Sequence, residues 1–170
     1  VKSVESIQEK MELQGIHLEN LAQDMQDIAG LRIMVQFEDD IAEVLQVLHQ
    51  RQDMRIVLER DYITHKKPSG YRSYHVIIEY PVDTIDGNKL VLAEIQIRTL
   101  AMNFWATIEH SLNYKYKGEF PEAIHERLER AAEAAFLLDE EMSEIREEIQ
   151  EAQYIFAICK ENQRKRKKRR

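Results

Sequence analysis

Two short segments of the sequence carry polar side chains at every second position, the spacing that places them on one face of a β-strand. The first segment, residues 93–98, alternates apolar residues with Glu94, Gln96 and Arg98. A carboxylate, an amide and a guanidinium on one face could bind and orient a polar substrate. The alternative is the solvated outer face of an antiparallel sheet.

The second segment follows a basic loop. Tyr71, Ser73 and His75 alternate in the same way, directly after Lys66 and Lys67. An aromatic ring can stack on a nucleotide base, while cations and hydrogen-bond donors can hold its phosphates. This combination favours a nucleotide site, and the alternative is a surface strand with an ordinary tyrosine.

A carboxylate, Asp27, stands just before an apolar run, residues 30–37, that contains Arg32. Magnesium ions are commonly held by one or two carboxylates together with the phosphates of a substrate. Asp27 and Glu94 could form such a pair if their strands are neighbours. Asp27 could equally cap a turn.

Sequence fingerprints of several other classes are missing. The chain has no GxxxxGK[ST] or GxGxxG motif, no His-Asp dipeptide and no cluster of cysteine and histidine. The sequence therefore argues against P-loop and Rossmann proteins and against the common metal-dependent hydrolases.

The elements that must position these residues follow from hydrophobic spacing. Apolar runs with strand spacing predict strands over residues 30–37, 54–63, 73–82 and 89–99. Helical spacing predicts helices over residues 1–14, 38–50 and 100–114. The Asp86-Gly87 pair predicts a hairpin between the last two strands, with residues 83–88 as its connection. The order of these elements indicates an α+β domain.

Residues 121 onward have an unusually regular apolar spacing. Apolar residues recur in alternating steps of three and four from Ile124 to Phe156, a heptad seam of more than four heptads. A helix of ~35 residues would be about 50 Å long, longer than the small domain before it. Its seam must find partners outside that domain, so we predict self-association. The alternative is that the first half packs back on the sheet and only the second half projects.

Composition narrows the class of protein. The 170 residues include 44% apolar residues, five Gly and three Pro, which suits one globular domain with an appendage and argues against a largely disordered chain. No apolar window reaches the length of about 18 residues that a membrane-spanning helix needs. A single cysteine, Cys159, cannot form an internal disulfide, which favours the reducing cytoplasm.

Charge is distributed unevenly along the chain. The net charge is −7, yet residues 164–170 are seven consecutive basic residues. The rest of the chain has 17 basic against 31 acidic residues, a net charge of −14. Such an acidic body is unlike a general binder of phosphate backbones, whereas the tail could attract single-stranded RNA. The alternative is a solvated, disordered end.

Four motifs, in order along the chain, resemble the synthetase domain of RelA/SpoT homologues. They are residues 27–32 (DIAGLR), 69–75 (SGYRSYH), 94–99 (EIQIRT), and Trp105-Ala106 with Glu109-His110. Over residues 1–153 the chain resembles small alarmone synthetases of the RelQ type. The resemblance implies a nucleotidyltransferase-like α+β fold with a mixed five-strand-type sheet, flanking helices and a long C-terminal helix. We therefore expect a synthetase domain over residues 1–118, an oligomerisation helix over 119–160 and a disordered basic tail over 161–170.

The activity that this resemblance implies is that of a GTP diphosphokinase. ATP would donate pyrophosphate to the 3′-hydroxyl of GDP or GTP, giving AMP and ppGpp or pppGpp, the alarmones of the stringent response. Larger relatives add a hydrolase domain with a His-Asp metal motif. Because this sequence lacks that motif, we expect a synthetase without hydrolase activity. As the single cysteine suggested, we expect it to work in the cytoplasm.

The same resemblance assigns roles to individual residues. Asp27 would bind Mg²⁺, and Glu94 would act as general base or second metal ligand. An ordinary glutamate is a weak base near neutral pH, so Glu94 would need a raised pKa or a metal-polarised hydroxyl. In the acceptor site, Tyr71 would stack on guanine, Lys67 and His75 would hold phosphates, and Gln96 and Asn103 would lie nearby. In the donor site, Arg32 would stack on adenine, and Lys2, Ser6 and Arg60 would contact the ATP phosphates.

The family also has functional features N-terminal to the position of Val1. The family has an arginine just before the position of Val1 that sandwiches adenine opposite Arg32, and N-terminal helices used in tetramer assembly and in binding allosteric alarmone. The sequence starts at Val1, without Met and inside an amphipathic pattern, so we expect an N-terminal segment before it. We also expect a homotetramer through the C-terminal helix, with (p)ppGpp as a candidate allosteric ligand.

Two functions of other classes remain open on the sequence. The first is a non-catalytic nucleotide or RNA sensor that keeps the fold and binds RNA through its basic tail. The second is an α+β scaffold whose heptad helix only assembles partners. The presence of Asp27, Tyr71 and Glu94 argues against an inactive relative.

Overall fold

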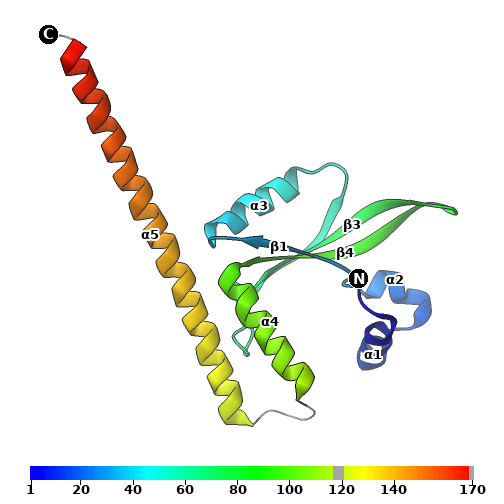
Figure 1. The fold of residues 1–170 in the computed structure, drawn as a ribbon. Coiled ribbons are helices and arrows are strands. Elements are labelled where there is room, and N and C mark those ends of the chain that lie inside the picture. Colours follow the sequence, from blue (N-terminus) through cyan, green and yellow to red (C-terminus); the bar gives the residue numbers. More distant parts are fainter. Residues whose placement is uncertain (117–120, 169–170) are drawn as a thin grey trace.

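The computed structural model describes the backbone of residues 1–116 and 121–168 and contains one mixed sheet with helices on both sides (Figure 1). Its strands are β1 (Ala29–Val35), β2 (Arg55–Asp61), β3 (Tyr74–Thr84) and β4 (Gly87–Thr99). Its helices are α1 (Val4–Gln14), the 3-10 turn η1 (Leu18–Asn20), α2 (Leu21–Asp24), α3 (Asp39–Gln50), α4 (Leu100–Lys115) and α5 (Glu122–Lys168). The strand order is β1-β4-β3-β2, with β1 parallel to β4 and the other pairs antiparallel.

The α+β class and every strand and helix predicted from hydrophobic spacing are confirmed. Helix α1 begins at Val4 because the Ser3 side chain accepts a hydrogen bond from the Ser6 backbone and caps it. The described part of the chain forms four strands, so the five-strand-type sheet implied by the resemblance is wrong. The residues that precede β1 coil into η1 and α2, and the residues after β4 have helical rather than strand spacing.

The hairpin between β3 and β4 is tighter than predicted. Thr84 pairs with Gly87, so only Ile85 and Asp86 form the turn, where a connection over residues 83–88 was predicted. Gly87 has a φ of 104°, a conformation that residues with a Cβ rarely adopt. The glycine therefore closes the turn, and the β-ladder extends right up to it.

The apolar core lies on the side of the sheet covered by α3. Its buried residues come from α3, β3, β4 and the start of α4: Ile41, Leu48, Val76, Ile78, Ile95, Ile97 and Met102. Helices α1 and α2 lie near the opposite side, where the alternate residues of β3 and β4 point (Figure 1). The sheet therefore has one apolar face in the core, while the other face carries polar residues of β3 and β4 together with the buried Ile77.

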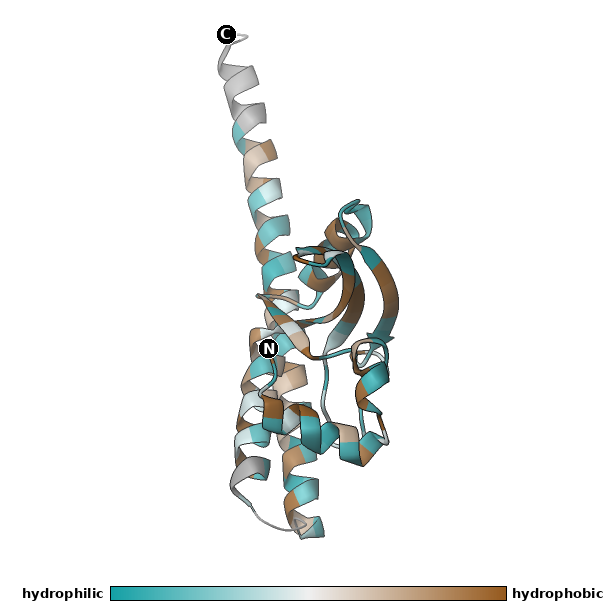
Figure 2. Ribbon diagram, turned by 90° about the vertical axis from the view of Figure 1, so that its right-hand side faces the viewer, coloured by the Kyte–Doolittle hydropathy of each residue, from teal (hydrophilic) through white to brown (hydrophobic). Residues whose placement is uncertain are grey.

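The long helix α5 has two dissimilar halves. Its first half packs along α4, where Trp105 Nε1 donates to the Leu128 carbonyl at 2.9 Å, and Arg146 ties it to Asp39 and Asp40 at the start of α3 at 2.8 and 2.9 Å. Beyond these contacts it projects away from the domain, as Figure 2 shows. The heptad seam changes accordingly from half-buried at Leu128 to exposed from Leu138 onward.

The backbone of α5 is helical to Lys168, whereas a disordered tail was predicted over residues 161–170, of which residues 169–170 lie outside the described part of the chain. From Glu122 onward the sequence contains neither Gly nor Pro and is rich in Glu, Lys, Arg, Gln and Ala. These residues favour a helix even without tertiary contacts. Among the described residues, no helix combines the length and the apolar character that crossing a membrane would need.

Candidate active site

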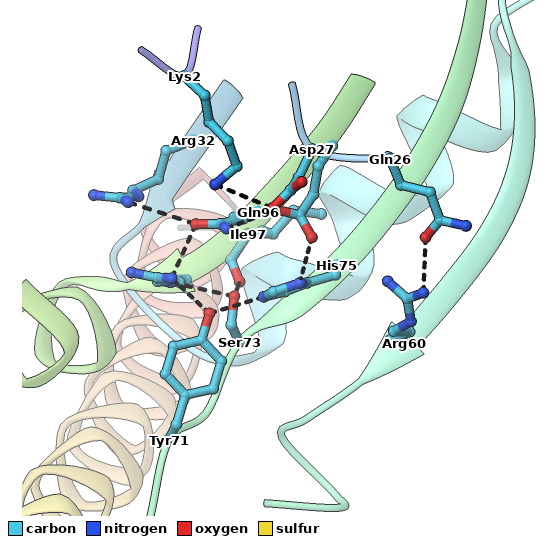
Figure 3. Close-up of polar contacts among 12 residues, drawn as sticks. Lys2, Gln26, Asp27, Arg32, Arg60, Tyr71, Ser73, His75, Gln96 and Ile97 are labelled. Atoms are coloured by element: carbon cyan, nitrogen blue, oxygen red, sulfur yellow. Dashed lines mark hydrogen bonds and ion pairs between the residues drawn. The ribbon is translucent and has the colours of Figure 1, made fainter. Parts of the chain in front are cut away.

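A chain of hydrogen bonds runs across the polar face of the sheet at the start of β3 (Figure 3). Tyr71 Oη and His75 Nε2 are 2.8 Å apart, and His75 Nδ1 donates to Glu94 Oε1 at 2.8 Å. Gln96, the cross-strand partner of His75, donates to the other oxygen of Glu94 at 2.8 Å. The two segments with alternating polar residues thus face each other and form one network.

Arg98 joins this network through its contacts with Tyr71, Gln96 and Ser73. Its Nη2 donates to Tyr71 Oη at 2.6 Å and to Gln96 Oε1 at 2.9 Å, and its Nε donates to Ser73 Oγ at 3.2 Å. The guanidinium is only 5% exposed. The alternative of a solvated outer face is therefore wrong, because Glu94 and Arg98 are both buried in mutually satisfied polar contacts.

The electrostatics of Glu94 suit an anion rather than a proton acceptor. Burial alone raises its pKa, but hydrogen bonds from His75 and Gln96 outweigh burial and lower the pKa to about 2. A carboxylate with so low a pKa holds a proton poorly at neutral pH. The raised pKa that a general base would need is absent, which leaves a metal-polarised hydroxyl as the route by which Glu94 could assist.

Asp27 is held by two lysines of the N-terminal region. Burial raises its pKa, but Lys10 Nζ at 2.7 Å and Lys2 Nζ at 3.2 Å from Oδ2 lower the pKa further than burial raises it. Its other oxygen, Oδ1, is buried and has no hydrogen-bond partner among the described residues. Because the partners of Asp27 are ammonium groups, the alternative of a turn cap is not what the structure shows.

Two clefts meet at this network. The smaller one, of about 400 Å³, is lined by Val1, Lys2, Asp27, Ile28, Gly30, Leu31, Arg32, Glu94 and Gln96. The larger one, of about 690 Å³, is lined by Lys10, Gln14, Asp24, Gln26, Asp27, Arg60, Tyr62, Lys67, Tyr71, His75, Glu94 and Gln96. Asp27, Glu94 and Gln96 line both clefts. A group transferred from a molecule in one cleft to a molecule in the other would pass these three side chains.

Most predicted site residues lie at these clefts. Lys2 and Arg32 are on the smaller one, and Lys67, Tyr71 and His75 are on the larger one. Arg60, which the resemblance placed with ATP, lies instead on the larger cleft, where Nη2 donates to Gln26 Oε1 at 2.8 Å.

Two predicted residues lie away from both clefts. The Ser6 hydroxyl pairs with Ser3 in the cap of α1. Asn103 lies on α4, outside the residues that line the clefts, and its buried Oδ1 has no partner among the described residues.

Several site residues were not predicted. Lys10 follows Ser6 by four residues and therefore shares its helix face, a signal that could have identified it. Tyr62 joins Tyr71 on the larger cleft: Lys67 Nζ lies 4.6 Å from the ring centroid of Tyr62 and 5.0 Å from that of Tyr71. Gln26 and Tyr62 have no sequence signal. The pairing of β2 with β3 places Tyr62 beside Ser73, and a hydrogen bond from Arg60 on β2 brings Gln26 to the cleft.

The donor atoms present fit a magnesium ion that is shared with a substrate. The described residues contain no cluster of three or more His, Cys, Asp and Glu side chains that would hold a metal alone. They do contain the unpartnered, buried Oδ1 of Asp27 and the ionised carboxylate of Glu94 on the same cleft wall. Mg²⁺ typically binds one or two carboxylates and completes its coordination with water and phosphate oxygens.

Comparisons with known proteins agree with this geometry. A family model described as "Region found in RelA / SpoT proteins" matches residues 1–119. The GTP pyrophosphokinase YjbM of Bacillus subtilis (strain 168) is 61% identical over 157 residues, which cover 92% of this chain and 74% of that protein.

Solved structures extend the agreement to the fold. The crystal structure of small alarmone synthetase 1 from Bacillus subtilis bound to its product pppGpp matches with a TM-score of 0.86 at 61% identity, over 88% of this chain and 77% of that one. A GTP pyrophosphokinase family protein from Streptococcus pneumoniae matches with a TM-score of 0.83 at 69% identity, over 90% of this chain and 75% of that one. With its family model, its relatives and its fold in agreement, this chain belongs to the RelA/SpoT family, among the small alarmone synthetases.

Proposed function

We propose that this chain is a (p)ppGpp synthetase, a GTP diphosphokinase that transfers pyrophosphate from ATP to the 3′-hydroxyl of GDP or GTP. The observation that carries the proposal is the pair of clefts that share Asp27, Glu94 and Gln96. Transfer between two nucleotides needs two adjoining sites with a common charged wall. The relative of known structure that binds pppGpp supports the same reaction.

The larger cleft suits the acceptor nucleotide. Tyr71 and Tyr62 offer aromatic surface for guanine, and Lys67 lies between them with its ammonium group able to reach phosphates. Before an acceptor enters, Tyr71 is bonded to Arg98 and His75. Lys67 Nζ and the Arg98 guanidinium lie 5.0 and 5.1 Å from the centroid of the Tyr71 ring, so stacking on guanine requires Lys67 to move off the ring.

The smaller cleft suits ATP. Arg32 is exposed on its wall and holds only one long hydrogen bond, 3.5 Å to Gln96, so its guanidinium is available to stack on adenine. Lys2 lies on the same wall beside Asp27. It can neutralise the phosphate chain as that chain approaches the shared carboxylates.

In the reaction the 3′-oxygen of the acceptor forms a bond to the β-phosphorus of ATP. The bond from that phosphorus to the oxygen bridging the α- and β-phosphates breaks, AMP leaves with that oxygen, and the proton of the 3′-hydroxyl is released to solvent. We assign Asp27 and Glu94 to Mg²⁺, which when bound would neutralise phosphate charge and make the acceptor hydroxyl more acidic. The side chains contribute mainly positioning and charge neutralisation, which is what this class of transfer requires.

Glu94 lies where it can accept a hydrogen bond from the acceptor hydroxyl and fix its direction. Its low pKa makes it a weak final acceptor for the proton, so we assign it an orienting and metal-binding role above a general-base role.

We further propose that the protein works in the cytoplasm as a homotetramer assembled through α5. Support comes from the projecting half of that helix, where Leu138, Met142 and Ile149 are 57%, 46% and 52% exposed. The replacement of Leu138 and Ile145 by Asp should shift the mass measured by light scattering to a smaller species, and an unchanged mass would contradict the assignment.

Allosteric (p)ppGpp and single-stranded RNA at the basic tail are further candidate ligands.

The decisive experiment incubates the protein with ATP, Mg²⁺ and either GDP or GTP and resolves the nucleotides by anion-exchange chromatography. AMP should appear together with a guanosine nucleotide of higher charge, and the Glu94→Gln variant should form neither. If the protein bound nucleotides but formed no product, the nucleotide or RNA sensor would replace the synthetase.

A further inference from the structure

The segment that carries the acceptor-side residues is pressed against α5. Gly70, in the loop between β2 and β3, has a φ of 86°, and a Cβ at this position would lie 2.5 Å from the Ala132 Cβ. Neither the backbone conformation nor the available space admits a larger residue. The loop and the first half of α5 are therefore in direct backbone-to-helix contact.

Glu133, the next residue on α5, binds both sides of this loop. Its Oε2 accepts a hydrogen bond from Lys66 Nζ at 2.9 Å and from Arg72 Nη2 at 3.2 Å. Arg72 is 8% exposed, and its guanidinium lies 3.7 Å from the ring centroid of Phe136, one turn further along α5. Of these two ion pairs, the one with Arg72 carries more weight, because the guanidinium is buried while the Lys66 pair is open to solvent.

The alternation of side chains along residues 71–73 links the contact with α5 to the active site. Arg72 points toward α5, while its neighbours Tyr71 and Ser73 point the other way and meet Arg98. Lys67 belongs to the same loop, closed by hydrogen bonds from the Lys67 backbone to Tyr71 and from the Gly70 backbone to Lys67. A shift of Arg72 would therefore move both the aromatic ring and the ammonium group of the acceptor cleft.

We propose that Glu133 is a positioning residue for the acceptor nucleotide: through Arg72 and Lys66 it fixes the loop that carries Lys67 and Tyr71. This inference rests on the proposed function, since it takes the larger cleft as the GDP or GTP site. It gives α5 a role in substrate binding in addition to any role in assembly. The donor cleft has no lining residue in this loop, so ATP binding should not depend on Glu133.

The test compares Glu133→Gln with Glu141→Gln, a matched change at an exposed position of the same helix. For Glu133→Gln we expect the KM for GDP and GTP to rise about fivefold, since the loop then loses the carboxylate that pairs with both Lys66 and Arg72. The kcat and the KM for ATP should stay within about twofold of the wild-type values. The control should match the wild type in all of these, and both variants should keep the wild-type circular dichroism spectrum.

A second variant and a binding measurement keep the proposal separable from a general effect on folding. Arg72→Lys keeps the charge but loses the bond from Nη2 to Glu133 and the stacking on Phe136, so it should also raise the acceptor KM. Calorimetric titration with α,β-methylene ATP, which lacks the cleavable bridging oxygen, should give wild-type affinity in both variants.

Four outcomes are distinguishable. A selective rise of the acceptor KM supports the positioning role. An acceptor KM unchanged in Glu133→Gln, or a loss of kcat and of α,β-methylene ATP binding together, overturns it while the synthetase assignment stands. A wild-type protein that forms no guanosine product overturns both.

Discussion

The two clefts are built in different ways although they share a wall. In the smaller cleft Arg32 is exposed and has a single hydrogen bond of 3.5 Å to Gln96. Tyr71 and His75 of the larger cleft are 2.8 Å apart. Tyr71 also accepts a hydrogen bond at 2.6 Å from Arg98, which lies outside the cleft lining, and His75 continues the chain to Glu94 at 2.8 Å. The wall of the smaller cleft thus offers independent groups, whereas the wall of the larger cleft is one coupled unit. Changes in the smaller cleft should act singly, and changes in the larger cleft should act on the whole network.

The largest effect should come from the shared carboxylates, because both clefts depend on them. Asp27→Asn and Glu94→Gln should each lower kcat roughly 1,000-fold, since they remove the charge that would hold Mg²⁺ and orient the acceptor hydroxyl. Single-turnover measurement of AMP release, with circular dichroism to confirm the fold, checks this. Retained turnover in Asp27→Asn would remove the metal role from that residue.

The next largest effect should follow from Tyr71. Tyr71→Ala should raise the acceptor KM about 10- to 100-fold, the range expected when an aromatic ring no longer stacks on a base. Tyr71→Phe keeps the ring but leaves Arg98 and His75 each without one partner. The double variant Tyr71→Phe with His75→Gln should raise the acceptor KM by less than the product of the two single effects, because both changes break the same chain of hydrogen bonds. Additive effects would show that the acceptor wall is not coupled.

A smaller and selective effect should separate the two arginines. Arg32→Ala should raise the KM for ATP about tenfold and leave the acceptor KM unchanged, as loss of a stacked guanidinium predicts. Arg60→Ala should instead raise the acceptor KM by a few-fold, because Arg60 lies on the larger cleft. A rise of the ATP KM in Arg60→Ala would restore the assignment taken from the family resemblance.

The smallest effect concerns the dependence of stability on pH. The pKa of Glu94 is about 2 in the folded protein and 4.5 ordinarily, so its ionised form stabilises the fold above pH 4.5. This contribution is lost as the pH falls from 4.5 toward 2. Between about pH 5 and pH 3 the free energy of unfolding, measured by urea titration, should therefore fall more for the wild type than for Glu94→Gln. The exposed change Glu141→Gln should leave the wild-type slope, and equal slopes in all three proteins would contradict the ionised network.

Local periodicity explains which parts of the fold were predictable. The strands and helices were found from apolar spacing, because the pattern of side chains that can be buried depends only on residues near in sequence. The exposed stripe of Leu100, Phe104 and Ile108 on α4 shows the limit of that signal. Spacing predicted the helix, but the face that packs on α5 is the one with Trp105 and Ala106.

The same division holds for the site. The sequence by itself determined that Glu94, Gln96 and Arg98 share one strand face and that Tyr71, Ser73 and His75 share another, because alternation is a property of the backbone. Only the tertiary structure decided that these faces meet, that Lys10 reaches Asp27, that Arg60 belongs to the larger cleft and that Glu133 holds Arg72. Those contacts join residues 17 to 61 positions apart. Strand register and helix packing set them, and neither leaves a local pattern in the chain.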